Sequence, residues 1–233
     1  MKKIFQVLKN RWAEYVIEIL VIIIGITLSF FFNNLKENRV ERKEEIKLLA
    51  SIHENLATDT LTLDARLKIL DILLHGYEQI LSPTIDTFPN DSIVLFLDFA
   101  VTYTKFQGTA VGYEELKQSK SSTIIKNRLL LRTIILHYDQ KYDLMTEWNE
   151  IDKGYVLDDM LPFLSKNMKY MEGKFLYNDV ETTLQLLESD DYFKNMIKSG
   201  RLYKQIIRLL YLQLKESTKV LMKEIEAELK VLK

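Results

Sequence analysis

The stretch EILVIIIGITLSFFFNNL, residues 18–35, decides how the rest of the chain is organised. Residues 19–32 carry no charge, and only Gly25, Thr27 and Ser29 interrupt the run of Ile, Val, Leu and Phe. The run is apolar on every face, whereas a helix of a soluble protein usually keeps one polar face. We therefore expect a transmembrane helix rather than the core helix of a soluble protein.

The length of the span is taken from the residues that flank this run. A span needs roughly 20 residues at about 1.5 Å each, and residues 13–34 reach that length. Trp12 and Tyr15 then lie at one interface, as in aromatic belts, and Asn33 and Asn34 lie at the other. A cleaved signal peptide is an alternative that suits the basic N-terminus, but no small-residue cleavage pattern follows the run. We expect an uncleaved anchor.

The orientation of the span depends on the basic residues on its two sides. Five basic residues follow it, mixed with acidic ones, and four precede it: Lys2, Lys3, Lys9 and Arg11. The positive-inside rule counts basic residues only, so the two sides are nearly balanced. The short, unmixed basic N-terminus favours a cytoplasmic tail at residues 1–12. Residues 35–233 are then a periplasmic domain anchored in the inner membrane.

Three residues of the span are candidates for more than anchoring. Gly25 and Ser29 are four residues apart, a small-xxx-small pair that lets another helix approach closely. Membrane helices also tolerate such residues without a partner, and the sequence leaves both readings open. Glu18 is a possible intramembrane carboxylate, which is a functional hypothesis by default. Close to the end of a span it can reach water instead, and we prefer that reading.

The composition predicts an all-α protein without cofactor or metal chemistry. Of 233 residues, 47% are apolar and 28% are charged, while Gly (7) and Pro (3) are scarce, which favours long helices. The chain has no cysteine, so disulfides and thiolate metal sites are excluded. Its net charge of −1 gives no global basic field that would attract nucleic acid.

The region after the span shows a heptad pattern, which is typical of helices that pack along a long seam. One row recurs every seven residues at Leu49, Leu56, Leu63, Leu70 and Tyr77. We expect a companion row three residues before each of these, at Ile46, His53, Thr60, Leu67 and Leu74, and ending at Leu81. Pro83 and Pro89 then end the helix.

The remaining sequence predicts further helices of the same bundle. An apolar helix at residues 93–106 is expected to be the innermost one, and YEELKQ at 113–118 is expected to be a short helix. Ser121 or Ser122 is expected to cap a longer helix with a buried stripe at Leu131, Ile135, Tyr138, Tyr142 and Met145. Residues 165–178 are expected to form a loop.

The last part of the chain completes the expected architecture. A short helix from Val180 to Leu187 is followed by a cap at Ser189 or Asp190 and by a final long helix. We expect an N-terminal transmembrane helix followed by an extended antiparallel bundle, in which the first and last long helices pair.

Three segments resemble a large family of uncharacterised single-pass membrane proteins of Gram-negative bacteria. Two of them are TAVGYEELKQSKSSTIIKNRLLLRTIILHYDQ (residues 109–140) and LLESDDYFKNMI (residues 186–197). The third is the anchor, with Glu18, ILVIII, Gly25, Ile26, Leu28, Asn33, Asn34 and Glu37. The chain departs from the family pattern in lacking Gly before Glu18, and at Phe31, Leu35 and Lys120. The family has no established activity, so the resemblance implies a fold and a location only.

A search for catalytic motifs leaves no candidate for enzyme chemistry. The sequence has no Walker loop, G-x-G-x-x-G, G-x-S-x-G or H-E-x-x-H. Its histidines, His53, His75 and His137, are far apart. We expect a non-enzymatic interaction or scaffold protein of the cell envelope, which self-associates or joins a larger complex. The alternatives are a ligand-sensing bundle and a subunit of an ion-driven complex that uses Glu18.

Overall fold

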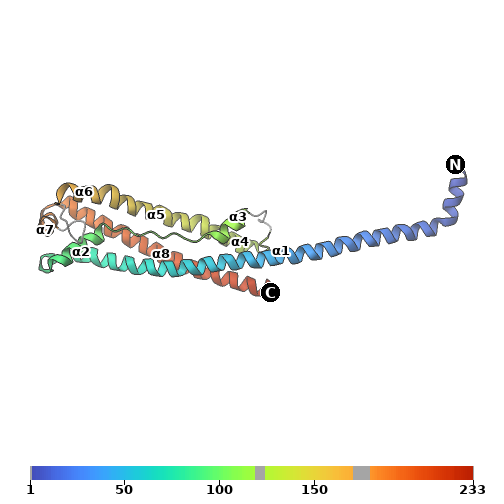
Figure 1. The fold of residues 1–233 in the computed structure, drawn as a ribbon, viewed down its shortest axis with the longest axis horizontal. Coiled ribbons are helices and arrows are strands. Elements are labelled where there is room, and N and C mark those ends of the chain that lie inside the picture. Colours follow the sequence, from blue (N-terminus) through green and yellow to red (C-terminus); the bar gives the residue numbers. More distant parts are fainter. Residues whose placement is uncertain (1, 119–123, 170–178, 233) are drawn as a thin grey trace.

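The computed structural model describes residues 2–118, 124–169 and 179–232, without the side chains of residues 2–11 and 13–15. These residues form helices joined by connections, with no strand in the described ranges. One N-terminal helix extends far beyond an elongated helical bundle (Figure 1). The expected all-α fold with one long apolar N-terminal helix is therefore confirmed.

The order of elements follows the chain from the N-terminal rod to the far end of the bundle and back. Two of the elements, η2 and η3, are π-helical turns, and η1 is a 3₁₀ turn. The bounds are α1 (Lys2–Ile80), η1 (Ile85–Thr87), α2 (Asn90–Ala100), α3 (Val111–Gln118), α4 (Arg128–Leu136), η2 (His137–Tyr142), α5 (Asp143–Gly154), η3 (Tyr155–Met160), α6 (Leu161–Asn167), α7 (Val180–Ser189) and α8 (Asp191–Leu232).

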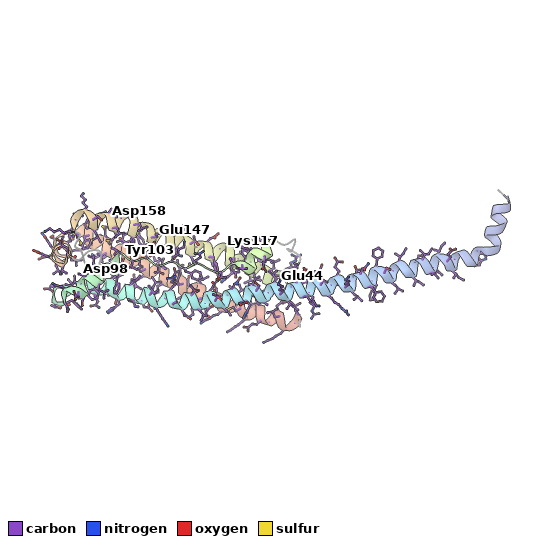
Figure 2. All side chains as sticks on the ribbon, in the orientation of Figure 1. Glu44, Asp98, Tyr103, Lys117, Glu147 and Asp158 are labelled. Atoms are coloured by element: carbon purple, nitrogen blue, oxygen red, sulfur yellow. The ribbon has the colours of Figure 1, made fainter. Side chains whose placement is uncertain are left out.

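α1 is one helix of 79 residues that connects the apolar segment directly to the bundle. The part from Val16 to Ile80 contains a window that is apolar enough to cross a membrane, and none of that window is buried against the rest of the chain. The expected tail at residues 1–12 is helical from Lys2 onwards. Figure 2 shows side chains on all sides of the part of α1 that extends beyond the bundle, with no other element beside them.

The bundle has four positions that alternate in direction along its long axis (Figure 1). α1 takes the first, and the continuous rod from α4 to α6 takes the third. α8 takes the fourth. The second position is unusual, because α2 and α3 are joined by an extended segment, residues 101–110, which runs where a helix would be expected.

α1 and α8 pair in antiparallel register, as the sequence predicted. Three cross-helix ion pairs fix the register: His53–Glu226 at 2.9 Å, Asp64–Lys215, and Asp71–Arg208 at 2.6 Å. From one pair to the next, the residue number rises by eleven and then by seven on α1, and it falls by the same amounts on α8. Because these pairs are largely exposed, they define register more than they add stability.

The heptad pattern is confirmed for one row and wrong for the other. Leu49, Leu56, Leu63, Leu70 and Tyr77 are all fully buried. The expected companion row is only half-buried apart from Leu67, and instead Ile52, Asp59, Leu73 and Ile80, three residues after members of the first row, are buried. The reason is that α1 packs on two sides, against α8 and against the segment that includes α2 and α3.

Two of the expected helices have different bounds. The apolar helix expected at residues 93–106 begins at Asn90, directly after Pro89, and ends at Ala100. It ends early because the side chains around it bind the backbone of the extended segment. The loop expected at residues 165–178 begins later, because α6 continues to Asn167. Residues 170–178 are not among the residues that the structure describes.

The structure confirms only part of the predicted buried stripe and of the predicted helix caps. Ser121 and Ser122 lie outside the described residues, and α4 is capped by Asn127, whose Oδ1 accepts from the backbone N–H of Leu130. Ile135, which was predicted to belong to the buried stripe, is exposed, and its neighbour Ile134 is fully buried instead. Residue spacing alone does not distinguish between the two. The predicted cap of the last helix is confirmed at Asp190, which accepts from the N–H of Phe193.

Leu70→Ala should destabilise the bundle by about 2–5 kcal/mol, because Leu70 is fully buried in the row that faces the core. Ile72→Ala, on the exposed side of the same turn, is the matched control and should change stability by less than about 0.5 kcal/mol. Chemical denaturation of both variants in one detergent measures the difference. Equal stabilities would show that the Leu70 row does not form the core.

Candidate functional site

The residues selected in the span lie together on α1 but outside the bundle. Gly25 follows Glu18 by seven residues and precedes Ser29 by four, so the three share one face of the helix. All three are exposed, and a Cβ added at Gly25 would meet nothing within 4 Å. This face therefore packs against no part of the described chain.

Three polar side chains of the bundle interior, Asp59, Asn149 and Tyr211, bind the backbone of the extended segment. Phe106 is the best example, because its N–H donates to Tyr211 Oη at 2.9 Å and its carbonyl accepts from Asn149 Nδ2 at 2.9 Å. Tyr211 Oη in turn donates to Asn149 Oδ1 at 2.6 Å. Near the end of the segment the N–H of Thr109 donates to Asp59 Oδ1, and just before its start Tyr77 Oη donates to the carbonyl of Ala100, the last residue of α2.

This arrangement replaces the hydrogen bonds that a helix would have made for itself. A buried backbone group without a partner costs free energy comparable to a lost hydrogen bond. Three elements of the bundle, α1, α5 and α8, therefore supply polar groups to one segment. No sequence pattern indicates these contacts, because Asn149 and Tyr211 lie 43 and 105 residues from Phe106.

A buried ion pair lies beside the same segment. Lys204 Nζ of α8 donates to Asp152 Oδ1 of α5, and both side chains are completely buried. Burial raises the pKa of Asp152 and lowers the pKa of Lys204, and each shift is opposed by the charge of the partner. Asp152 Oδ2 and the nearby buried Thr104 Oγ1 have no hydrogen-bond partner within the described part of the chain.

A second polar cluster lies closer to the end of the bundle at which the apolar segment of α1 extends. Tyr142 Oη donates to the second oxygen of Asp59, whose pKa burial raises. His137 Nε2 lies 3.3 Å from Thr218 Oγ1, and the stacked rings of Tyr113 and Tyr138 have centroids 4.5 Å apart. Burial lowers the pKa of His137 to about 4, with a smaller contribution from Lys141.

Both π-helical turns lie at these clusters. η2 carries His137 and Tyr142, and η3 begins at Tyr155, whose hydroxyl donates to the carbonyl of Met196 in α8. A π turn accommodates one extra residue and is frequent at functional sites. Here the two turns direct large polar rings from the third rod toward α8 and the extended segment.

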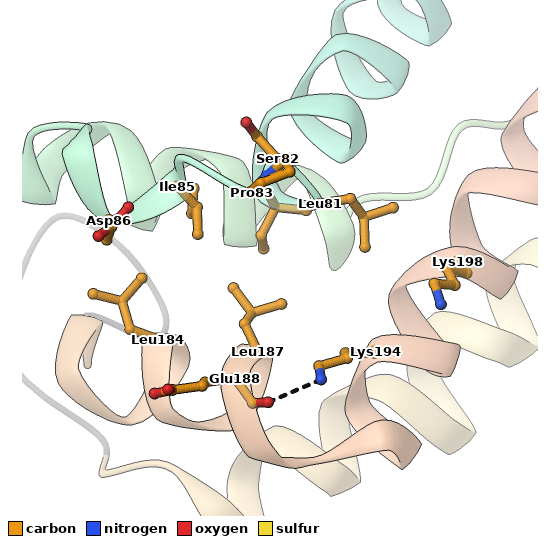
Figure 3. Close-up of a pocket in the computed structure, with 11 residues that line it drawn as sticks. Leu81, Ser82, Pro83, Ile85, Asp86, Leu184, Leu187, Glu188, Lys194 and Lys198 are labelled. Atoms are coloured by element: carbon orange, nitrogen blue, oxygen red, sulfur yellow. Dashed lines mark hydrogen bonds between the residues drawn. The ribbon is translucent and has the colours of Figure 1, made fainter.

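The far end of the bundle carries a groove of about 500 Å³ between the α1–α2 connection and α7 (Figure 3). Leu184 and Leu187 of α7 face Ile85 across it. Lys194 borders it but already donates to the carbonyl of Glu188 at 2.9 Å. The rim is mixed in charge, with no excess that would select an ion.

The chemistry available to these residues is mainly structural. His53 pairs with Glu226, His75 is exposed, and His137 is buried, so the three histidines are not brought together. The described ranges contain no group of three or more side chains placed to hold a metal ion. Some interior polar residues hold the extended segment, and others, such as His137 with Thr218 and Tyr155 with the carbonyl of Met196, join one helix to another.

Comparison with protein-family models, curated proteins and solved structures finds no significant match to this chain. The resemblance to the single-pass membrane family therefore stays an expectation, and the function has to be argued from the geometry.

Lys204→Met should destabilise the protein by about 3–5 kcal/mol, because it leaves Asp152 buried without a partner. The double variant Lys204→Met with Asp152→Leu removes both charges and should recover most of the loss. Denaturant midpoints of the four proteins in this cycle give the coupling energy. Lys153→Met, in the exposed pair with Glu150, is the control and should cost less than about 1 kcal/mol. Additive losses in the cycle would contradict the assignment.

His137 should make the bundle less stable as the pH falls. Its pKa is lowered from an ordinary value of 6.5 to about 4, so the folded protein favours the neutral ring. The contribution is complete above pH 6.5 and is lost as the pH falls through about 4, a change of about 3 kcal/mol.

The control is His137→Gln, which retains a polar group but does not titrate. Carboxylates that titrate in the same range are common to both proteins, so their effects cancel in the difference. The free energy of unfolding of the variant should depend less on pH between 6.5 and 4. Identical pH profiles would show that His137 is not held neutral by the fold.

Proposed function

We propose that this chain is a membrane-anchored, non-enzymatic interaction or scaffold protein of the bacterial cell envelope. In this proposal residues 1–12 lie in the cytoplasm, residues 13–34 span the inner membrane, and residues 35–233 lie in the periplasm. The observation that supports it best is the continuity of α1, since one helix carries both the exposed apolar segment and the first face of the bundle core.

This continuity suits a protein that displays a surface at a fixed distance from a membrane. At about 1.5 Å per residue, the part of α1 between Leu35 and Ile80 extends about 70 Å. The membrane end and the core share one helix, so the bundle is held upright on its anchor. An interaction surface on the bundle then has a defined height and direction.

An exposed apolar row on α8 supports self-association. Leu202 is 52% exposed, Leu209 55% and Val220 50%, and Ile206 lies between the first two on the same side. The row points away from α1 and from the third rod, because the opposite side of α8 is buried. Copies anchored in one membrane share one orientation, which makes a parallel second copy the partner that fits this row.

The proposed association is tested with Leu202→Lys combined with Leu209→Lys. These changes should leave the thermal midpoint nearly unchanged and reduce the fraction of oligomer, because the row contributes to no core within the chain. Leu61→Lys with Ile72→Lys, on the exposed side of α1, is the matched control and should leave the oligomer intact. Native mass spectrometry from mild detergent measures the stoichiometry and any co-purifying partner. A wild-type chain that is monomeric and without a partner would overturn the proposal.

Two other functions are separated by the same preparations. In an ion-driven complex, Glu18→Gln would preserve assembly yet abolish the phenotype in a strain lacking the native copy. A scaffold tolerates that change, whereas Gly25→Leu would reduce assembly if the small face packs against a helix. A ligand-sensing bundle is favoured by one observation: Asp152 Oδ2 and Thr104 Oγ1 are buried and have no hydrogen-bond partner among the described residues.

A further inference from the structure

Directly after the apolar segment of α1, basic and acidic residues are mixed in the sequence but lie on different faces of the helix. Lys36, Arg39 and Lys43 are three and four residues apart, so they lie on one face of the helix. All three are exposed. Glu37, Glu41, Glu44 and Glu45 fall on the other side of the helix at the same level.

The acidic side of this segment faces the bundle. Glu41 Oε2 lies 2.6 Å from Lys126 Nζ, and Glu45 Oε1 accepts from the backbone N–H of Lys126 at 2.7 Å. A neighbouring cation is also used within the fold, because Arg42 donates to the carbonyls of Val231 and Leu232 at the end of α8. The acidic side thus contacts the protein, and the basic face does not.

The basic face has no partner in the described part of the chain. Lys36, Arg39 and Lys43 make no ion pair or hydrogen bond there. They border a shallow recess of about 390 Å³, whose apolar part is formed by Phe32, Leu35 and Val40. No carboxylate lines it. The recess therefore joins the end of the apolar segment to a purely cationic surface.

The height of this surface matches the headgroup layer of a bilayer. At about 1.5 Å per residue, Lys36 and Arg39 lie within about 6 Å of Leu35 along α1. The headgroup layer is about 5–8 Å thick on each side of the hydrocarbon. Lys43 lies about 12 Å beyond Leu35, and its long side chain can reach back toward the layer.

We propose that the face formed by Lys36, Arg39 and Lys43 binds the phosphate headgroup of an anionic phospholipid of the surrounding bilayer. The lysines and the arginine contact the phosphate, and the upper part of an acyl chain packs against Phe32 and Leu35. A second copy is a poorer occupant, because parallel copies meeting at this face would bring like charges together. The inference rests on the proposed membrane anchorage but does not depend on self-association.

The test uses the full chain in mild detergent with phosphatidylglycerol or phosphatidylcholine as the probe. Native mass spectrometry counts the lipids bound at increasing lipid concentration. The wild type should bind phosphatidylglycerol in preference to phosphatidylcholine. Since each basic residue near an anionic surface contributes about fivefold, replacing all three by Gln should weaken phosphatidylglycerol binding by about tenfold or more. This variant is Lys36→Gln with Arg39→Gln and Lys43→Gln.

Two further variants separate the face from the total charge. The first exchanges neighbours, through Lys36→Glu, Glu37→Lys, Lys43→Glu and Glu44→Lys, so composition and net charge are kept while the cationic face is broken. It should lose the preference for phosphatidylglycerol. The second removes three exposed lysines far from the span, through Lys68→Gln, Lys141→Gln and Lys166→Gln. It should bind as the wild type does.

Each contrary result overturns the inference. A wild type without preference for phosphatidylglycerol, or an exchange variant that retains it, would show that no lipid site exists on this face. Displacement of the lipid by inorganic phosphate alone would show a simple anion site that needs no bilayer. Extraction of the chain from membranes by alkaline carbonate would overturn the anchorage as well. A chain that is inserted in the membrane but shows no preference for phosphatidylglycerol would contradict the lipid site and would not contradict the proposed function.

Discussion

Hydrogen bonding to one extended segment, residues 101–110, is the constraint on which the interior of the bundle depends. A helix satisfies its own backbone, but this segment lies among helices and must take its partners from side chains. Asp59, Asn149 and Tyr211 supply them from the first, third and fourth positions of the bundle. The second position is therefore held by polar contacts to three neighbours as well as by apolar packing.

This constraint explains why polar and aromatic residues are concentrated in an otherwise apolar core. Phe106 fills the centre of a cluster with Leu63, Leu70 and Tyr211, while its backbone groups are both bonded. A π turn lies near each cluster, and its wider geometry lets Tyr142 and Tyr155 reach their partners. The Asp152–Lys204 pair is the part of this interior that is least satisfied, since one carboxylate oxygen lacks a partner.

Sequence reasoning succeeded where the governing contacts repeat locally. The row through Leu56 and Leu63 was visible because its period is built into the helix, and the cap at Asp190 was visible because a cap acts within three residues. The companion row was placed on the wrong side of α1, since the choice depends on what packs there. Residue spacing does not distinguish Ile134 from Ile135, and only the packing in the folded structure shows that Ile134 is the buried one.

The interior site was beyond sequence reasoning for a different reason. Lys204 and Asp152 are 52 residues apart, and neither belongs to a motif that would relate them. An early end of α2 at Ala100 could not be read from an apolar run that continues past it. The charges of residues 36–45 are a milder case, because the separation into two faces follows from helical geometry once a continuous helix is assumed. What sequence could not supply was the contact of the acidic side with Lys126.

The contact of Arg42 with the end of α8 determines how far each part of the bundle lies from the apolar segment, measured along α1. Arg42 lies seven residues beyond Leu35, about 10 Å along α1, so α8 ends close to the level where the apolar segment ends. In the anchored chain the near end of the bundle would lie at the membrane surface. The groove at Ile85 and Leu187 would lie nearly 60 Å farther out, at about 1.5 Å per residue along α1. In that proposed arrangement the cationic face would be within reach of lipid, whereas an occupant of the distal groove would have to come from the aqueous phase or from another envelope layer.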